Sequence, residues 1–326
     1  MTDDENPNLA DPAILDEQTT EILRRLEADP FLDLDMNPAE MRIAFDRFYA
    51  GIPIPFDPIA SVEDRMIGGP AGNIAIRIYT PFSETGTNQA AVLFLHGGGM
   101  MMGSLDAYDT LCRRLAAKSS AIIVSSSYRL APEAKFPAAV EDALAAFEWL
   151  KMHGHEIGAD TTKLAVAGES GGGNLAAVVA MHEARSKNGA LKLQVLINPA
   201  VGASADVSSM QRFARGFFFE PEVLEWFLSQ YLEDPAEVND ERASPVLSTD
   251  FSGLPSTQIV YAGCDILRDH IENYANHLRA AGVDVEQSCY ENTIHGFTVM
   301  AGIIDVGRDA LDKCAEAIRQ KFYSQG

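Results

Sequence analysis

The chain has 326 residues, 47% of them hydrophobic and 22% charged, which is the composition of a folded protein that can bury a large core. Its net charge of −22 would repel nucleic acids and anionic membranes, so we expect neither as a partner and assign the acidity to solubility. No apolar run approaches the ~20 residues of a membrane span, and the acidic N-terminus is unlike a signal peptide, so we expect a cytoplasmic location.

Residues 1–50 differ in composition from the rest of the chain. They contain thirteen Asp or Glu residues against four Arg and no Lys. Apolar residues recur at helical spacing, first around Ile22 and Leu26 and then, after Pro30, from Met41 to Phe48. The pattern predicts two amphipathic helices that pack on the remainder of the protein. We therefore interpret residues 1–50 as an N-terminal helical cap segment.

From residue 51 to residue 326, strand patterns alternate with helix patterns. Strands are expected at 74–79, 91–95, 121–124, 164–167, 191–197, 258–261 and 283–290, and helices at 105–117, 137–152, 171–185, 269–281 and 306–322. This alternation predicts an α/β fold, with a mainly parallel central sheet and helices on both faces. The length permits two domains, but one domain over 51–326 accounts for the pattern equally well.

One insertion, at residues 203–250, interrupts this alternation. It has no clear strand, and its run from Pro221 to Leu232 reads as a helix with an aromatic face. Aromatic residues most often pack in a core. The position of the insertion between two central strands favours a lid over the functional edge of the sheet equally well, and we interpret 203–250 as an inserted cap segment.

The stretch from Leu164 to Ala177 holds an apolar run, the sequence Gly168-Glu169-Ser170-Gly171-Gly172, and an Ala-rich helical run. This layout is typical of a nucleophile elbow, a sharp strand-to-helix turn that presents a serine hydroxyl. Side chains at the first and last glycines of the five would collide with the neighbouring strand and helix. The pentapeptide alone arises by chance in about one chain in ten of this length. Its significance therefore depends on the rest of the chain.

Acyl transfer needs a nucleophile, a base, a group that orients the base, and donors for the oxyanion. Ser170 is the candidate nucleophile, and Asp265 and His295 each follow an expected strand. The sequence His96-Gly97-Gly98-Gly99 ends another strand and leaves backbone N–H groups free for an oxyanion. Taken singly, the aspartate could cap a helix and the histidine could be a loop residue. Four features at four strand ends in one consistent order favour a single acyl-transfer site.

Metal chemistry has no comparable support in the sequence. The remaining histidines show no metal-ligand spacing, and the cysteines form no C-x-x-C pair. We therefore expect no metal and no cofactor, and we expect the cysteines to be isolated buried thiols.

The chain resembles the hormone-sensitive-lipase-like (bacterial family IV) esterases of the α/β-hydrolase superfamily from about residue 70 to the C-terminus. The resemblance rests on five motifs: His96-Gly-Gly-Gly99, Tyr128-Arg-Leu-Ala-Pro-Glu-Ala-Lys-Phe-Pro137 with the residues to Asp142, Gly168-Glu-Ser-Gly-Gly-Gly-Asn174, Asp265-Ile-Leu-Arg-Asp269 and His295-Gly-Phe297. It implies an α/β-hydrolase fold with an N-terminal cap and an inserted cap helix, which match residues 1–50 and 203–250.

The resemblance also implies residue roles. Ser170 would attack an ester carbonyl, and His295 would act first as base and then as acid. Asp265 would hold the imidazole tautomer and stabilise the imidazolium. The oxyanion hole would consist of the backbone N–H groups of Gly98, Gly99 and Gly171.

The chain departs from the family pattern next to the nucleophile. The family usually has Asp or Thr before the serine and Ala after it, where this chain has Glu169 and Gly171. Glycine retains the N–H group but adds backbone flexibility, which could loosen the oxyanion hole. The family's Asp-Pro-Leu is Asp265-Ile-Leu here, which keeps the carboxylate.

Four residues are candidates for substrate binding. Met100 and Met101 replace commoner aromatic or aliphatic residues after the His-Gly-Gly-Gly sequence. Methionine side chains adapt their shape, so they predict a pliable acyl or alcohol pocket. Phe217 and Phe218 lie in the aromatic part of the insertion.

Together these features predict a serine carboxylic-ester hydrolase that cleaves soluble esters of short to medium chain length through an acyl-enzyme. The expected partner is a small-molecule ester, and the expected state is a monomer or homodimer. The same residues could serve as a deacetylase, lactonase or amidase. A non-enzymatic receptor on this fold is disfavoured, because relatives that became receptors lost the histidine at the position of His295.

Overall fold

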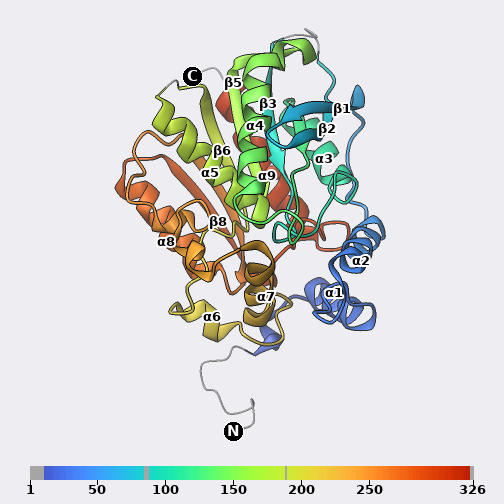
Figure 1. The fold of residues 1–326 in the computed structure, drawn as a ribbon. Helices are drawn as coiled ribbons and strands as arrows, with labels where there is room; N and C mark the ends of the chain where they lie inside the picture. The colour runs from blue at the N-terminus through green and yellow to red at the C-terminus, as the bar shows by residue number, and fades with distance from the viewer. Residues whose placement is uncertain (1–10, 84–87, 188, 324–326) are drawn as a thin grey trace.

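The computed structural model describes residues 11–83, 88–187 and 189–323, so residues 1–10 of the predicted cap segment lie outside the described residues. An eight-stranded sheet runs through the molecule (Figure 1). The strands are β1 (Ser61–Gly69), β2 (Gly72–Thr80), β3 (Gln89–Leu95), β4 (Ile122–Ser126), β5 (Ala159–Glu169), β6 (Leu191–Ile197), β7 (Ser256–Cys264) and β8 (Val285–Ile294).

The sheet is mainly parallel, as the sequence predicts. Its order is β1-β2-β4-β3-β5-β6-β7-β8, and only β1 with β2 and β2 with β4 pair antiparallel. Every residue of β3 is buried, because helices cover both faces of the sheet there. Pairing of β3 with β5 sets Leu95 opposite Gly168. The carboxyl ends of these central strands therefore meet at one edge of the sheet.

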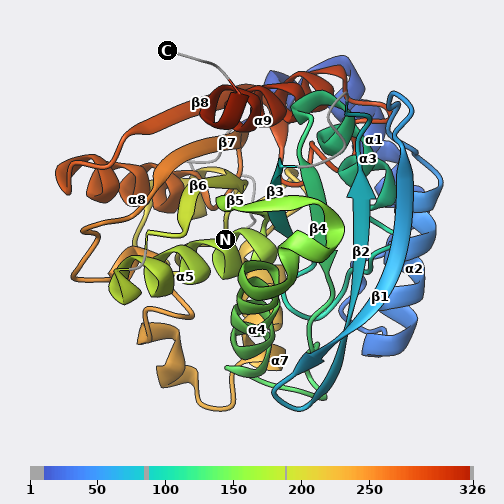
Figure 2. The same cartoon turned by 90° about the horizontal axis from the view of Figure 1, so that it is seen from above.

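Helices form a layer on each face of the sheet. The helices are α1 (Glu17–Ala28), α2 (Pro38–Ala50), α3 (Asp109–Ser119), α4 (Ala138–His153), α5 (Gly171–Ser186), α6 (Ser208–Arg212), α7 (Pro221–Tyr231), α8 (Arg268–Ala280) and α9 (Asp305–Tyr323). Short 3₁₀ helices are η2 (Pro12–Ile14), η3 (Gly154–Ile157), η4 (Pro235–Asn239) and η5 (Pro245–Leu247). Figure 2 shows α3 and α9 on one face and α4, α5 and α8 on the other. The predicted α/β fold with helices on both faces is confirmed.

Two segments far apart in the sequence meet at the same end of the molecule. Figure 1 shows α1 and α2, from the N-terminal segment, at the same end of the molecule as α6 and α7, from the insertion. Phe31 packs edge to face on Phe218, with their ring centroids 5.7 Å apart. The buried hydroxyl of Thr19 in α1 donates to the hydroxyl of Thr293 at 3.0 Å, which joins α1 to the end of β8. The N-terminal segment is thus attached to the strand that precedes His295.

Candidate active site

Ser170 lies at a sharp turn between β5 and α5. Its backbone angles are φ 53° and ψ −117°, a conformation that non-glycine residues rarely adopt. A Cβ at Gly168 would lie 2.0 Å from the carbonyl oxygen of Gly172, and a Cβ at Gly172 would lie 2.0 Å from that of Leu95. The turn therefore requires glycine at both positions, as the elbow sequence predicts.

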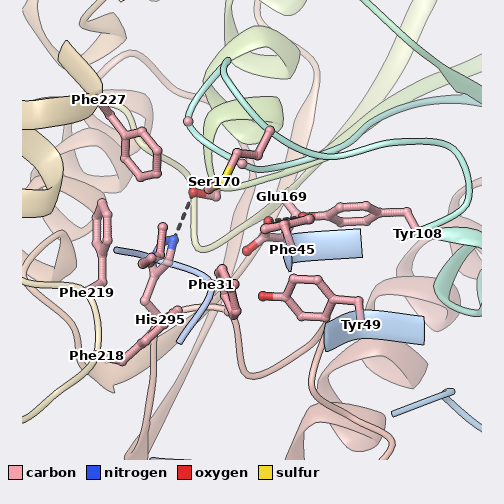
Figure 3. A pocket seen from close by; sticks show the side chains of 15 residues that line it. Phe31, Phe45, Tyr49, Tyr108, Glu169, Ser170, Phe218, Phe219, Phe227 and His295 are labelled. Carbon is pink, nitrogen blue, oxygen red and sulfur yellow. Dashed lines mark hydrogen bonds between the residues drawn. The ribbon is translucent and has the colours of Figure 1, made fainter. Parts of the chain in front are cut away.

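A chain of hydrogen bonds joins the three candidate catalytic residues. The Ser170 Oγ lies 2.8 Å from the His295 Nε2, and Figure 3 shows this bond. The His295 Nδ1 lies 2.6 Å from the Asp265 Oδ2. A carboxylate only accepts, so Nδ1 carries the proton and Nε2 is left to accept from the serine hydroxyl. The second carboxylate oxygen accepts from the backbone N–H of Leu267 at 2.9 Å, which fixes its orientation.

The environment of His295 sets its proton affinity. Burial favours the neutral imidazole, but the Asp265 carboxylate bonded to it and the nearby Glu169 carboxylate together outweigh burial and raise the pKa of His295 above its usual value. Phe219 from the insertion stacks on the imidazole, with 4.5 Å between ring centroids and 25° between planes. The ring is therefore held by a carboxylate at one nitrogen and by an aromatic face.

The candidate oxyanion donors meet close to Ser170. A Cβ built on Gly171 would lie 3.3 Å from the backbone nitrogen of Gly99, so the two glycines are close neighbours. Gly98 and Gly99 have φ values of 106° and 62°, which favour glycine. Within the part of the chain that the structure describes, the N–H groups of Gly98, Gly99 and Gly171 donate no hydrogen bond to protein. These donors are free for a bound oxyanion.

The Tyr128–Glu133 motif packs against the glycine-rich loop that follows His96. The Tyr128 hydroxyl donates to the carbonyl of His96 at 2.7 Å, and the two rings stack with centroids 4.3 Å apart. Burial lowers the pKa of His96 to about 4, so its ring is neutral. Glu133 binds Arg42 of α2 through two hydrogen bonds, of 2.9 and 2.6 Å, and the same guanidinium donates to the carbonyl of Met101 at 2.8 Å. The motif therefore acts structurally, by linking α2 to the glycine-rich loop.

Two cavities adjoin Ser170. The first is shown in Figure 3 and is lined by Phe31, Leu32, Phe45, Tyr49, Gly98, Gly99, Met102, Tyr108, Glu169, Ser170, Phe218, Phe219, Phe227, His295 and Gly296. The second is lined by Gly99, Met100, Ser170, Gly171, Asn174, Ala200, Gly202, Ala203, Phe219, Leu224, Phe227, Leu228, Tyr231 and Ala243. Both cavities include the nucleophile, and Phe219 and Phe227 border both.

The four expected substrate-binding residues take different positions. Met100 lines the second cavity and Phe218 lines the first, whereas Met101 and Phe217 line neither. Met101 is fully buried, and Phe217 packs edge to face on Phe213 with centroids 5.2 Å apart. Successive side chains diverge because both segments turn sharply, with φ values of 59° at Met100 and 72° at Phe218. Substrate contact by Met101 and Phe217 therefore stays a prediction from the sequence, without support from the lining of these two cavities.

Sequence reasoning missed several cavity residues. Phe31, Phe45 and Tyr49 come from the N-terminal segment, and Phe219 and Phe227 come from the insertion. Their aromatic character was visible in the sequence, but the face of each segment that meets the cavity depends on how the segment docks. Glu169 and Tyr108 also line the first cavity, and the Tyr108 hydroxyl donates to the carboxylate at 2.8 Å.

The described residues also bear on metal binding and on membrane insertion. In residues 11–83, 88–187 and 189–323, no group of three or more His, Cys, Asp or Glu side chains could hold a metal ion. In the same ranges, every helix is too short or too polar to cross a membrane.

Comparison with known proteins identifies the family. A family model described as the alpha/beta hydrolase fold matches residues 92–299. The chain belongs to the hormone-sensitive-lipase-like family of α/β-hydrolases. Among its relatives in this family, ethyl acetate hydrolase of Pseudomonas putida is 39% identical over 249 residues, which cover 76% of this chain and 78% of that protein. Carboxylic ester hydrolase LipN of Mycobacterium tuberculosis is 43% identical over 242 residues, which cover 72% and 64%.

Solved structures of family members have the same fold as this α/β-hydrolase. The esterase of Pyrobaculum calidifontis superposes with a TM-score of 0.89 at 37% identity, over 94% of this chain and 98% of that one. An ester hydrolase from the metagenome of Lake Arreo superposes with a TM-score of 0.91 at 34% identity, over 95% and 100%. Both neighbours are named as enzymes that act on esters.

Proposed function

We propose that this hydrolase cleaves carboxylic esters of short to medium chain length through an acyl-enzyme on Ser170. The observation that carries the proposal is the hydrogen-bond chain from Ser170 through His295 to Asp265, at 2.8 and 2.6 Å. The names of the relatives support an ester as the substrate, since they include ethyl acetate hydrolase and carboxylic ester hydrolase. A monomeric or homodimeric state and a cytoplasmic location stay predictions from the sequence.

Acylation begins at the hydroxyl of Ser170. His295 Nε2 takes the hydroxyl proton while Oγ bonds to the ester carbonyl carbon, and the carbonyl electron pair moves to the oxygen. The N–H groups of Gly98, Gly99 and Gly171 stabilise that oxyanion. The intermediate collapses by breaking the bond to the alcohol oxygen, which receives the proton from Nε2. Asp265 stabilises the imidazolium throughout.

Deacylation repeats these steps with water. His295 takes a proton from water, the resulting hydroxide attacks the acyl carbon, and the bond to Ser170 Oγ breaks. The proton then passes from Nε2 to Oγ, which restores the starting state. The neutral Nε2 that faces Ser170 is the form that both half-reactions require.

The alcohol part and the acyl part of the ester can each be placed in one of the two cavities. His295 must protonate the leaving alcohol oxygen, so the alcohol part belongs on the side of the serine where the histidine lies. His295 and Gly296 line only the first cavity. We therefore place the alcohol part in the first cavity and the acyl part in the second, beside Met100 and Gly171.

We further infer that the N-terminal segment and the insertion act as a cap. The N-terminal segment borders the cavities through Phe31, Phe45 and Tyr49. The insertion borders them through Phe219 and Phe227. Excluding water there strengthens the electrostatic interactions that stabilise charge in the transition state. Residues 51–326, apart from the insertion at 203–250, form the catalytic domain of this proposal.

The proposal is tested by replacing the nucleophile. Ser170→Ala should lower kcat for p-nitrophenyl acetate by on the order of 10⁴-fold or more, because the hole and substrate binding retain only a small part of the rate enhancement. An unchanged thermal unfolding midpoint would show that the variant is folded. A folded variant that keeps the wild-type rate would refute the proposal.

A further inference from the structure

Glu169 presents a buried carboxylate to the first cavity. It is the last residue of β5, its side chain is almost fully buried, and it lines the cavity next to Ser170. Among the described residues, Tyr108 is its one hydrogen-bond donor, through the 2.8 Å bond to Oε2. A Cβ at Gly97 would lie 1.9 Å from that oxygen, so the glycine makes room for it. Figure 3 shows the Tyr49 hydroxyl pointing toward the same carboxyl group.

This carboxylate has no permanent cationic partner. No Lys or Arg is among the residues that line the cavity, and the sole group there that can become positive is the His295 imidazole. Burying a carboxylate without a paired cation is costly, and the cost appears as a pKa that burial raises to about 7. A bound cation would offset this cost.

The walls of the cavity suit a cation as well. Phe45 lies 4.5 Å from Tyr49, and Phe31 lies 5.3 Å from Phe45 and 5.7 Å from Phe218, measured between ring centroids. These four rings form a continuous aromatic cluster that lines the cavity. Aromatic faces attract alkylammonium groups through the ring quadrupole, most strongly where water is excluded.

The second cavity provides a contrast within the same site. No Asp, Glu, Lys, Arg or His is among the residues that line it. A charged group on the substrate therefore finds a partner on the alcohol side of Ser170 and none on the acyl side. The net charge of −22 adds a field that attracts cations to the molecule from a distance.

We propose that the first cavity is an ammonium-binding subsite, in which Glu169 and the rings of Phe31, Phe45 and Tyr49 hold a positively charged alcohol part of the ester. The inference rests on the proposed function and on the placement of the alcohol part beside His295. It names the substrate class as esters of alkylammonium alcohols.

The test compares two esters of the same shape that differ by one charge. They are acetylcholine, which is the acetate ester of choline and is called choline acetate below, and 3,3-dimethylbutyl acetate. For the wild-type enzyme, kcat/KM at pH 8 should be higher for choline acetate by about tenfold or more, given the strength of cation–π and carboxylate contacts in a desolvated site. In Glu169→Gln the ratio should fall several-fold below the wild-type ratio, while the aromatic rings retain part of the preference for the charged ester. Any general loss of activity cancels in the ratio, because it affects both esters.

Several results would overturn the inference. A wild-type ratio at or below one would do so, and so would a ratio that Glu169→Gln leaves unchanged, which would mark the carboxylate as structural or as a partner of His295. Failure of the proposed function has a different signature, since p-nitrophenyl acetate would then not be hydrolysed or its hydrolysis would survive Ser170→Ala. An enzyme active on p-nitrophenyl acetate but inactive on choline acetate would refute only the subsite.

A second measurement needs no variant. Choline and 3,3-dimethylbutan-1-ol have the same shape and should both compete with p-nitrophenyl acetate for the wild-type enzyme. Choline should inhibit at about tenfold lower concentration, because it alone can pair with the buried carboxylate. Equal inhibition, or stronger inhibition by the neutral alcohol, would contradict the inference.

Discussion

Gly171 and Met100 share one space beside the nucleophile. A Cβ at Gly171 would lie 2.8 Å from the sulfur of Met100, so the methionine occupies the position where an alanine side chain would extend. The two departures from the family pattern are therefore linked. Alanine at position 171 of this chain would need Met100 to adopt another rotamer.

The proton affinity of His295 predicts the pH dependence of catalysis. The base must be neutral, and the carboxylates of Asp265 and Glu169 raise the pKa of the imidazole, so kcat/KM should rise with pH through a midpoint above the ~6.5 of a free imidazole. In Asp265→Asn the larger of these two raising charges is absent, and the midpoint of the residual activity should move to lower pH. Rates with p-nitrophenyl acetate from pH 5 to 9 measure both midpoints. A flat profile, or a midpoint that the variant does not move, would exclude this role for the pair.

The elements show what local sequence patterns can and cannot determine. The expected strand at 191–197 coincides with β6, and the expected helix at 306–322 lies within α9, because both have a strong apolar period. Strand β1 was not predicted, because this antiparallel edge strand buries only Ile67 and has no apolar alternation. Short α6 was missed for a similar reason, being five residues long.

The residues of the candidate site likewise fall into those that local sequence patterns predict and those that they do not. The residues at strand ends were predictable, because the sheet topology brings the carboxyl ends of β3, β5, β7 and β8 to one edge. The positions of Phe31, Phe219 and Phe227 were not, because they depend on contacts between segments distant in sequence. The partnership of Glu169 with Tyr108 spans 61 residues and has no local signal.

The close backbone approach at Gly172 of the nucleophile elbow can be tested by substitution. Gly172→Ala would place a methyl group 2.0 Å from the backbone oxygen of Leu95, which cannot move without shifting β3. We expect a loss of about 1–3 kcal/mol in the free energy of unfolding, together with reduced activity. Gly68→Ala is the matched control, because nothing lies within 4 Å of its Cβ, and it should change stability by less than about 0.5 kcal/mol. Equal stability of the two variants in urea unfolding would contradict the close approach.

Residues from nearly the whole length of the chain line the candidate active site. The cavity beside Ser170 is bordered by residues from Phe31 to Gly296. The contact of Phe31 with Phe218 closes the site between the N-terminal segment and the insertion. Because of these contacts, we expect the proposed cap and the catalytic domain to unfold together as one cooperative unit.

The charge of the whole molecule predicts a response to salt. The chain has 47 acidic and 25 basic residues, so acidic groups in excess repel one another. Salt screens this repulsion, as the Debye length falls from ~30 Å at 0.01 M to ~3 Å at 1 M. The thermal unfolding midpoint at pH 8 should therefore rise with NaCl, and equally with KCl if screening is the cause. A midpoint that falls with both salts would show that ion pairs, and not repulsion, dominate.

The central claim is that Ser170 is a nucleophile activated by His295, and covalent labelling tests it most directly. A fluorophosphonate should add one phosphonyl group per wild-type chain, and mass spectrometry of the digested protein should locate it on Ser170. The Ser170→Ala variant should remain unlabelled, and His295→Ala should be labelled far more slowly because its serine lacks a base. A label on another residue, or equal labelling of Ser170→Ala, would contradict the account.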